Sequence, residues 1–212
     1  PHLLRRAAWA AGAVAACAAG MAAKEVMATA PLVVLVHDRL FLHRSWRRLL
    51  RRRCALYAGL AATWGILAAL LARGPRTLSA GFAMEDVTVW PYARSQFGVI
   101  LHYLRMVFWP HPQVLDYGWP VAETVGQVPP QALAVGALLA ATVWALRRRP
   151  AAGFAGAWFF LILAPTSSLV PIRDLMYEHR MYLPLAGVAA AVVAGAWWVG
   201  SAALARRRAA PR

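Results

Sequence analysis

The twenty residues PTSSLVPIRDLMYEHRMYLP, 165–184, carry more varied polar chemistry than any other stretch of this length in the chain. Arg173 and Arg180 could bind a phosphate, because the planar guanidinium matches its oxygens in a bidentate way. Asp174 or Glu178 could hold such an arginine in place or act as a base. The alternative is structural, since tyrosine and arginine side chains are also ordinary anchors at a membrane boundary. The pattern leaves both interpretations open.

Two other places hold candidate residues. Lys24 and Glu25 could form a simple exposed ion pair, or could place a cation and a carboxylate beside a lipid phosphate. Asp116, in HPQVLDYGWP, is an acid among aromatic residues, which is typical of a sugar-binding site and equally of a membrane-boundary belt. Glu178 and His179 do not form a metal site by themselves, because zinc needs three or four ligands. We therefore predict no metal site.

Long apolar runs must position these residues. The chain has 212 residues, of which 61% are hydrophobic, and its mean hydropathy is +0.51. The ranges 54–72, 150–172 and 181–205 contain no charged residue. Each is long enough as a helix to cross a hydrocarbon core that needs about 20 residues. The sequence therefore predicts an all-α, polytopic integral membrane bundle that forms a single domain over 1–212.

The basic residues indicate orientation rather than nucleic-acid binding. A net charge of +15 would suggest a nucleic-acid partner in a soluble protein. Here the arginines fall in blocks at the ends of apolar runs: RR at 5, RSWRRLLRRR at 44, RRRP at 147 and RRR at 206. The positive-inside rule predicts this pattern for cytoplasmic loops. We predict no nucleic-acid partner and a lipid bilayer as the surroundings.

Placing all four arginine blocks in the cytoplasm predicts six crossings. The expected helices cover 7–23, 26–43, 54–72, 131–146, 151–164 and 182–204, with a basic loop at 44–53. The second helix is the weakest, because Pro31 interrupts it, and Asp38 and Arg39 would have to snorkel to the interface. The range 95–110 is hydrophobic but contains His102 and Arg105, so we predict an external interfacial or re-entrant helix there.

This topology separates the acidic residues from the arginine blocks. Of the eight acidic residues, only Asp38 faces the cytoplasm. The others face outward: Glu25, Glu85, Asp86, Asp116, Glu123, Asp174 and Glu178. Acidic residues contribute little to orientation, so this distribution does not follow from the positive-inside rule. We expect any chemistry to face away from the cytoplasm. The uncharged runs argue against a proton pump or an ion-coupled transporter.

Three stretches, in order, resemble a known family. They are AKEVMATAPLVVLVHD, VILHYLRMVFWPHPQVLDYGWP and LAPTSSLVPIRDLMYEHRMYLPLAG. They resemble the membrane part of the bacterial and animal tetratricopeptide-repeat membrane proteins related to protein O-mannosyltransferases, of the GT-C class of glycosyltransferases. The resemblance extends from about Ala7 to Gly187. It implies a GT-C-like fold in the bacterial inner membrane, with the functional loops on the periplasmic side.

The resemblance also implies an activity. It implies transfer of a sugar, mannose in the animal members, from a polyprenyl-phosphate-linked donor to a hydroxyl of an acceptor protein on the non-cytoplasmic side. The residues expected to bind substrate are Lys24, Arg173, Arg180, His179, Tyr182 and Asp116. The expected orienting carboxylates are Glu25 and Glu178.

The chain also departs from the family pattern. The animal relatives tend to carry arginine directly after the glutamate of the last motif, where this chain has His179 and then Arg180. Family members carry the catalytic acid in a first external loop, and the matching section would precede Pro1. Tetratricopeptide repeats usually follow the membrane part. We therefore expect a fragment that is inactive alone, and the alternative function is a non-catalytic membrane scaffold or partner subunit of a glycosylation system.

Overall fold

The computed structural model describes residues 2–43, 45–72, 88–114, 116–122, 126, 128–167 and 174–209, and these residues contain helices and no strand. The predicted all-α class is thus confirmed. The α-helices are α1 His2–Ala23, α2 Ala30–His37, α3 Trp46–Ala72, α4 Val89–Phe108, α5 Pro129–Arg148, α6 Pro150–Leu163 and α7 Tyr182–Ala209. The shorter elements are the 3₁₀ turns η1 Glu25–Thr29 and η4 Glu178–Met181 and the π-helical turn η2 Asp38–Leu42.

Four of these helices are long and apolar enough to cross a membrane, which is compatible with an integral membrane protein. They cover Leu4–Ala23, Trp46–Ala72, Pro129–Arg148 and Glu178–Ala205. Helix α6 has 14 residues, which rise about 21 Å at 1.5 Å per residue, short of a core about 30 Å thick. The uncharged run 150–172 does not form one helix, because α6 ends at Leu163. The six predicted crossings are therefore not confirmed.

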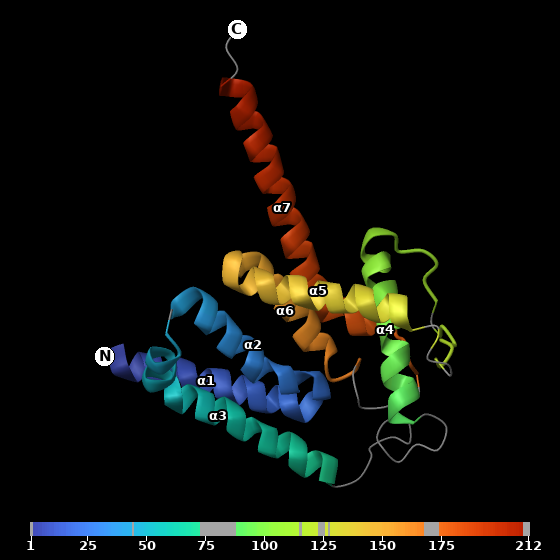
Figure 1. The fold of residues 1–212 in the computed structure, drawn as a ribbon. Helices are drawn as coiled ribbons and strands as arrows, with labels where there is room; N and C mark the ends of the chain where they lie inside the picture. The colour runs from blue at the N-terminus through green and yellow to red at the C-terminus, as the bar shows by residue number, and fades with distance from the viewer. Residues whose placement is uncertain are drawn as a thin grey trace.

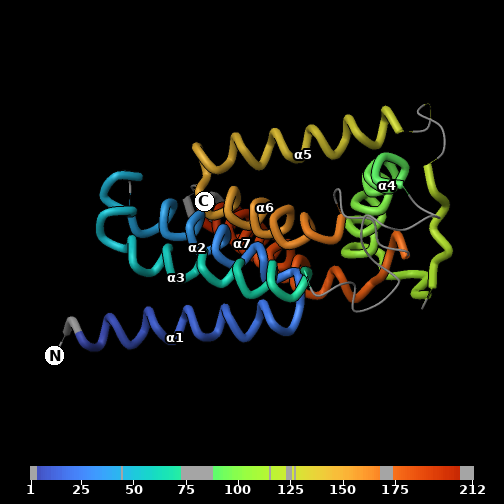
Figure 2. The backbone as a smooth tube through the Cα atoms, turned by 90° about the horizontal axis from the view of Figure 1, so that it is seen from below, coloured from blue at the N-terminus to red at the C-terminus, as the bar shows by residue number. Residues whose placement is uncertain are grey.

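Most helices lie side by side, and α4 lies across them. In Figures 1 and 2, α1, α2, α3, α5 and α6 run alongside one another, whereas α4 crosses their direction at one end. Helix α1 packs against α3, and α6 packs against both α5 and α7, while α2 contacts α3 and α6 and so joins the two groups. Helix α7 projects away from the other helices toward the C-terminus (Figure 1).

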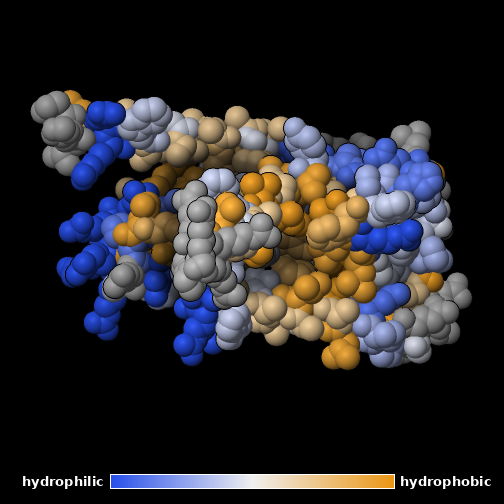
Figure 3. Space-filling view, turned by 90° about the horizontal axis from the view of Figure 1, so that it is seen from above, coloured by the Kyte–Doolittle hydropathy of each residue, from blue (hydrophilic) through white to orange (hydrophobic). Residues whose placement is uncertain are grey.

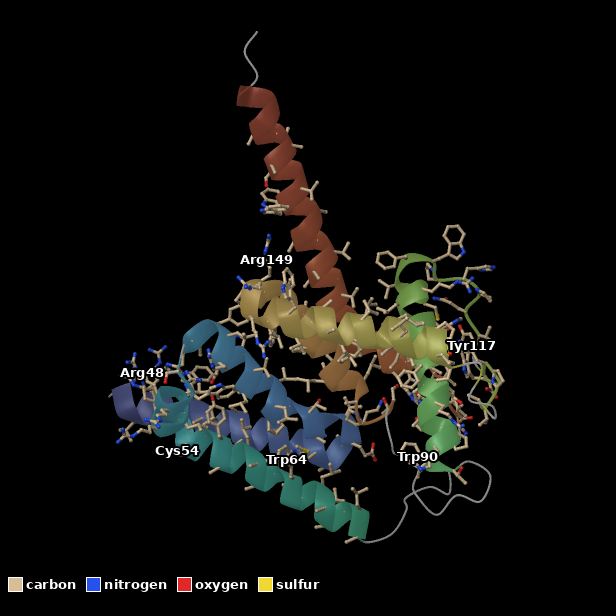
Figure 4. The ribbon with its side chains drawn as sticks, in the orientation of Figure 1. Arg48, Cys54, Trp64, Trp90, Tyr117 and Arg149 are labelled. Atoms are coloured by element: carbon tan, nitrogen blue, oxygen red, sulfur yellow. The ribbon has the colours of Figure 1, made fainter. Side chains whose placement is uncertain are left out.

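The charged residues divide the molecule into two ends with an apolar middle. The basic end, as we call it, carries the arginines at the starts of α1 and α3 and at the end of α5. The opposite, loop end consists of α4, residues 109–114 and 116–122, and residues 174–182. Figure 3 shows hydrophilic residues at both ends and hydrophobic residues between them. In Figure 4, Arg48 lies at the basic end and Tyr117 at the loop end.

The second predicted helix, 26–43, was wrong in its extent and in the role of Pro31. Pro31 occupies the first turn of α2, where the missing N–H of proline costs nothing and its fixed φ favours the helix. The α-helix ends at His37 and continues as the π-helical turn. Asp38 does not snorkel to the interface: its residue is 3% exposed, and its carboxylate accepts hydrogen bonds from Arg53 and Tyr57, each at 2.8 Å.

The predicted basic loop 44–53 is largely helical. Helix α3 begins at Trp46 and passes through a kink at Arg53, which has φ −130° and ψ 21°. The Arg53 side chain reaches Asp38 from this kink. The arginines of residues 47–52 thus form the first turns of α3 rather than a loop, since the α-helical hydrogen bonds continue through them.

Helix α4 begins six residues earlier than the predicted helix 95–110. It is not among the four helices of spanning length and composition. One face is buried at Tyr92, Gln96, Val99 and Tyr103, a spacing that follows the 3.6-residue period of a helix. The main core joins this face to α5, α6 and the turn before α7; its buried members are Val99, Ile100, Tyr103, Val135, Phe159, Leu163, Met176 and Met181.

Candidate functional site

Buried polar side chains of α4 hold the backbone that precedes η4. The Tyr103 hydroxyl donates a hydrogen bond to the Tyr177 carbonyl at 2.8 Å and accepts one from the Tyr177 N–H at 3.1 Å. Gln96 Nε2 donates to the Leu175 carbonyl at 3.2 Å. These bonds satisfy irregular backbone groups that would otherwise be buried without partners. Helix α4 therefore fixes the approach to the candidate residues 178–182.

The two buried tyrosines of α4 lie within the electric field of Arg180. Burial raises the pKa of Tyr92 to about 12, and the Arg180 charge opposes this rise. Burial also raises the pKa of Tyr103, which the Tyr177 backbone and Arg180 oppose. Both hydroxyls are thus protonated donors at neutral pH, and the Tyr92 hydroxyl donates to the Thr166 carbonyl.

Backbone carbonyls that precede Arg180 in the chain hold its side chain in place. Its two terminal nitrogens donate to the Leu175 carbonyl at 3.2 Å and to the Asp174 carbonyl at 2.8 Å. Its guanidinium carbon lies 5.6 Å from the centre of the Tyr177 ring. The guanidinium also forms side-chain hydrogen bonds with Tyr92 and Tyr103, so these contacts together orient the group beside η4.

Glu178 connects η4 to the segment that follows α4. Its Oε1 accepts hydrogen bonds from the Val114 N–H at 2.9 Å and from the Tyr117 hydroxyl at 2.6 Å. Burial first, and the Glu178 carboxylate second, raise the pKa of Tyr117. Within the described residues, Oε2 has no hydrogen-bond partner, so the carboxylate can accept a further hydrogen bond.

His102 of α4 lies beside the same aromatic residues. Its ring makes edge-on contacts with Tyr117 and Trp119, with ring centres 5.4 Å and 5.1 Å apart. Burial first, and the neighbouring Arg105 second, lower the pKa of His102, while Glu178 opposes this shift. His102 is therefore neutral at pH 7, and its Nε2 is buried without a hydrogen-bond partner in the described part of the chain.

A cavity of about 380 Å³ opens next to Glu178. Helix α4, residues 110–113, η4 and the first turn of α7 surround it. Three predicted site residues line it, Glu178, His179 and Tyr182. Its apolar wall consists of Met106, Val107, Met181 and Leu185, with Tyr103 and Pro110 completing the lining beside Gln113. The cavity thus combines a polar edge with an apolar wall.

Lys24 and Glu25 lie at the end of α1. Both are exposed, and among the described residues neither forms an ion pair, so the predicted alternative of mutual neutralisation is not observed. Lys24 lies close enough to His179 for their charges to interact, as Arg180 also does. The fold therefore brings Lys24 toward η4, whereas nothing in the structure brings Glu25 into contact with the cavity.

Asp116 has a local structural role. Its Oδ1 accepts a hydrogen bond from the Gly118 N–H at 3.0 Å, and Gly118 has φ +48°. This is a side-chain turn of the kind that aspartate favours, and the left-handed φ suits glycine. The aromatic neighbours Tyr117 and Trp119 contact His102 rather than forming an open face beside the carboxylate.

Several predicted residues lie outside the described part of the chain, and several important ones were missed. Arg173, together with the predicted outward acids Glu85, Asp86 and Glu123, is not described.

The residues missed were Gln96, His102, Tyr103 and Tyr117. The signal for Gln96 and Tyr103 was their helical spacing with Tyr92, which marks one face of α4; no such pattern pointed to His102 or Tyr117.

No family model, no curated protein and no solved structure matches this chain. The family resemblance therefore stays a prediction. Among the described residues, no three His, Cys, Asp or Glu side chains come together as metal ligands.

Proposed function

We propose that this chain is the membrane domain of a GT-C-like glycosyltransferase that binds a polyprenyl-phosphate-linked sugar at its loop end, on the periplasmic side of the bacterial inner membrane. One observation carries the proposal. Lys24, which is distant in sequence, and Arg180 each lie close enough to His179 for their charges to act on it, and His179 lines the cavity together with Glu178.

The cavity suits a ligand with a charged head and an apolar chain. Lys24 and Arg180 would offset the charge of the carrier phosphate, because both act electrostatically on His179 at the edge of the cavity. The apolar wall at Met106, Val107 and Leu185 would accept the first units of the polyprenyl chain. Glu178 would accept a hydrogen bond from a sugar hydroxyl through Oε2.

In the proposed transfer, the hydroxyl oxygen of the acceptor protein attacks the anomeric carbon of the sugar. The bond from that carbon to the phosphate oxygen breaks, and the phosphate leaves with the bonding electrons. The acceptor proton passes to a general base. The residues of this chain would therefore contribute positioning and stabilisation of the leaving phosphate.

Binding tests the proposal without requiring catalysis by this chain alone. The whole chain in lipid nanodiscs should bind polyprenyl phosphate mannose more tightly than the neutral polyprenol. Lys24→Gln should weaken binding of the phosphate compound about fivefold, the effect of roughly one surface charge. Arg105→Gln is the matched control, because Arg105 is exposed on α4 and does not line the cavity. Equal binding of both lipids would exclude a phosphate site at the loop end.

Transfer can be measured with the protein as it occurs in its native membranes. Glu178→Gln and Arg180→Ala should abolish sugar transfer to the acceptor protein while membrane insertion persists. Arg180→Lys keeps the positive charge, so it separates the effect of losing the charge from the effect of losing the hydrogen bonds to the carbonyls of residues 174 and 175. Full transfer by both Glu178→Gln and Arg180→Ala would show that the site lies elsewhere.

The second candidate, a non-catalytic scaffold or partner subunit, is favoured by one observation. Helix α7 is exposed throughout residues 189–200, including Trp197 at 80% and Val193 at 69%. An apolar helix of this kind can pack against a helix of another subunit in the membrane. A chain that binds no polyprenyl phosphate but co-purifies in a fixed ratio with a glycosyltransferase would support this function.

A further inference from the structure

A second and larger cavity lies at the basic end, far from the proposed sugar site. It has a volume of about 880 Å³ and is enclosed by α1, residues 34–43 and the start of α3. Its basic side chains are Arg6, Arg52 and Arg53, beside His43, and its apolar lining includes Trp9, Val34 and Leu56. The cavity thus has an arginine-rich mouth and a wall of hydrocarbon.

The packing of α1 explains why the space exists. Toward the loop end, α1 packs tightly, with Cys17 and Met21 in a core cluster with Leu60 of α3. Toward the basic end, α1 presents Ala7, Ala10 and Ala13 to the cavity. Their side chains are too short to fill the space to α2 and α3. Trp9 stays 72% exposed, so this side chain, in the N-terminal half of α1, has little protein packed against it.

The charges at the mouth are only partly compensated. Asp38 is the acidic residue that the structure places here, and it binds Arg53 at 2.8 Å and His37 at 3.3 Å. The Tyr57 hydroxyl donates a hydrogen bond to the same Asp38 oxygen that Arg53 binds. Within the described residues, Arg6 and Arg52 have no carboxylate partner. Two guanidinium groups therefore face one cavity without a counter-charge.

We infer that this cavity binds an anionic phospholipid of the cytoplasmic leaflet. The arginine blocks assign the basic end to the cytoplasmic side, where the leaflet carries the anionic lipids. The headgroup phosphate accepts hydrogen bonds from Arg6 and Arg52, whose planar donors match phosphate oxygens. One acyl chain lies along Ala10, Val34 and Leu56 and supplies the packing that α1 lacks. The site is independent of sugar transfer.

Native mass spectrometry of the whole chain in detergent can measure lipid binding directly. We expect dioleoylphosphatidylglycerol to remain bound and dioleoylphosphatidylcholine to dissociate. The double change Arg6→Gln with Arg52→Gln should weaken phosphatidylglycerol binding about thirtyfold, since each cation near the surface contributes roughly 1 kcal/mol. Arg147→Gln with Arg148→Gln removes the same charge from the basic end outside the cavity and should leave binding unchanged.

A variant that fills the cavity distinguishes lipid binding inside the cavity from general electrostatic attraction of anionic lipid to the basic end. Ala10→Phe keeps every charge but occupies the place of the acyl chain, so it should also weaken binding. Ala11 is exposed and does not line the cavity, so Ala11→Phe should leave binding unchanged. An equal loss in the α5 double variant, or undiminished binding in Ala10→Phe, would overturn the inference. Thermal unfolding of each variant verifies that the helices remain packed.

Discussion

Tyr103 and Tyr177 exchange two hydrogen bonds although 74 residues separate them: the Tyr103 hydroxyl donates to the Tyr177 carbonyl at 2.8 Å and accepts from its N–H at 3.1 Å. A single side chain thus satisfies both backbone groups of one residue directly before η4. The contact joins the crossing helix α4 to the segment that carries Glu178, His179 and Arg180, so it positions the candidate site.

Replacement of Tyr103 should loosen this segment. Tyr103→Phe leaves both backbone groups of Tyr177 without their partner, and each buried unsatisfied group costs about 1–3 kcal/mol. We expect a lower unfolding temperature and faster amide hydrogen exchange at residues 174–178. Tyr182→Phe is the control, because Tyr182 is 85% exposed and makes no such bonds. Unchanged exchange in Tyr103→Phe would contradict the assigned role.

The Glu178 clamp should hold residues 112–117 against η4. Glu178 Oε1 accepts from the Val114 N–H and from the Tyr117 hydroxyl at 2.9 Å and 2.6 Å. Tyr117→Phe removes one of these bonds and Glu178→Ala removes both, so proteolysis at 112–117 should be faster in both variants and fastest in the second. Equal cleavage rates in all three chains would show that the clamp does not restrain the segment.

Alkaline pH should destabilise α4 through Tyr92. Burial raises its pKa from the ordinary value of 10 to about 12, so the folded state retains a proton that the unfolded state loses first. The stabilisation is complete below pH 10 and is lost as the pH rises from about 10 to 12. Tyr92→Phe should flatten the fall of the unfolding free energy across this range, measured by denaturation in detergent. Parallel curves for the two chains would contradict the assignment.

The Asp38 cluster should couple α2 to the kink in α3. Asp38 accepts from Arg53 and Tyr57, each at 2.8 Å, and a buried carboxylate gains from both donors. Asp38→Asn and Tyr57→Phe should each destabilise the fold, and the double variant should cost less than the sum of the two. The coupling, about 1 kcal/mol, is measurable by unfolding in a denaturing detergent. If the losses of unfolding free energy in the two single variants simply add in the double variant, the hydrogen bond between Tyr57 and Asp38 does not contribute to stability.

Gly153 should be irreplaceable in the hairpin of α5 and α6. A Cβ at Gly153 would overlap the backbone of Leu146, whereas a Cβ at Gly136 of α5 would meet nothing within 4 Å. Gly153→Ala should therefore separate the two helices and lower the unfolding temperature. Gly136→Ala should be neutral or slightly stabilising, since alanine favours a helix by about 1 kcal/mol over glycine. Equal changes of the unfolding temperature in the two variants would contradict the close approach of α6 to α5 at Gly153.

The sequence by itself determined the helical class and much of the helix placement. In a bilayer, backbone groups must be satisfied within helices or closed barrels, and uninterrupted apolar runs of this length favour helices. The ranges predicted for α5 and α7 differ from the observed helices by at most five residues at either end. The cytoplasmic placement of the four arginine blocks stays a prediction, while the arginines of α1, α3 and α5 lie at one end of the structure (Figure 4). Local patterns also led to errors: Pro31 was assigned as a break, although proline at the first turn of a helix favours its start.

Tertiary structure alone decided which residues meet. Asp38 was predicted at the interface, but the kink at Arg53 and the Tyr57 hydroxyl bury it. Lys24 approaches His179 and Tyr117 reaches Glu178 across many residues of intervening chain. Helical periodicity specifies which face of α4 is apolar, but not which distant carbonyl a buried tyrosine on that face will satisfy. That choice depends on helix packing, because a hydrogen bond requires its two partners within about 3 Å and the sequence does not encode that distance locally.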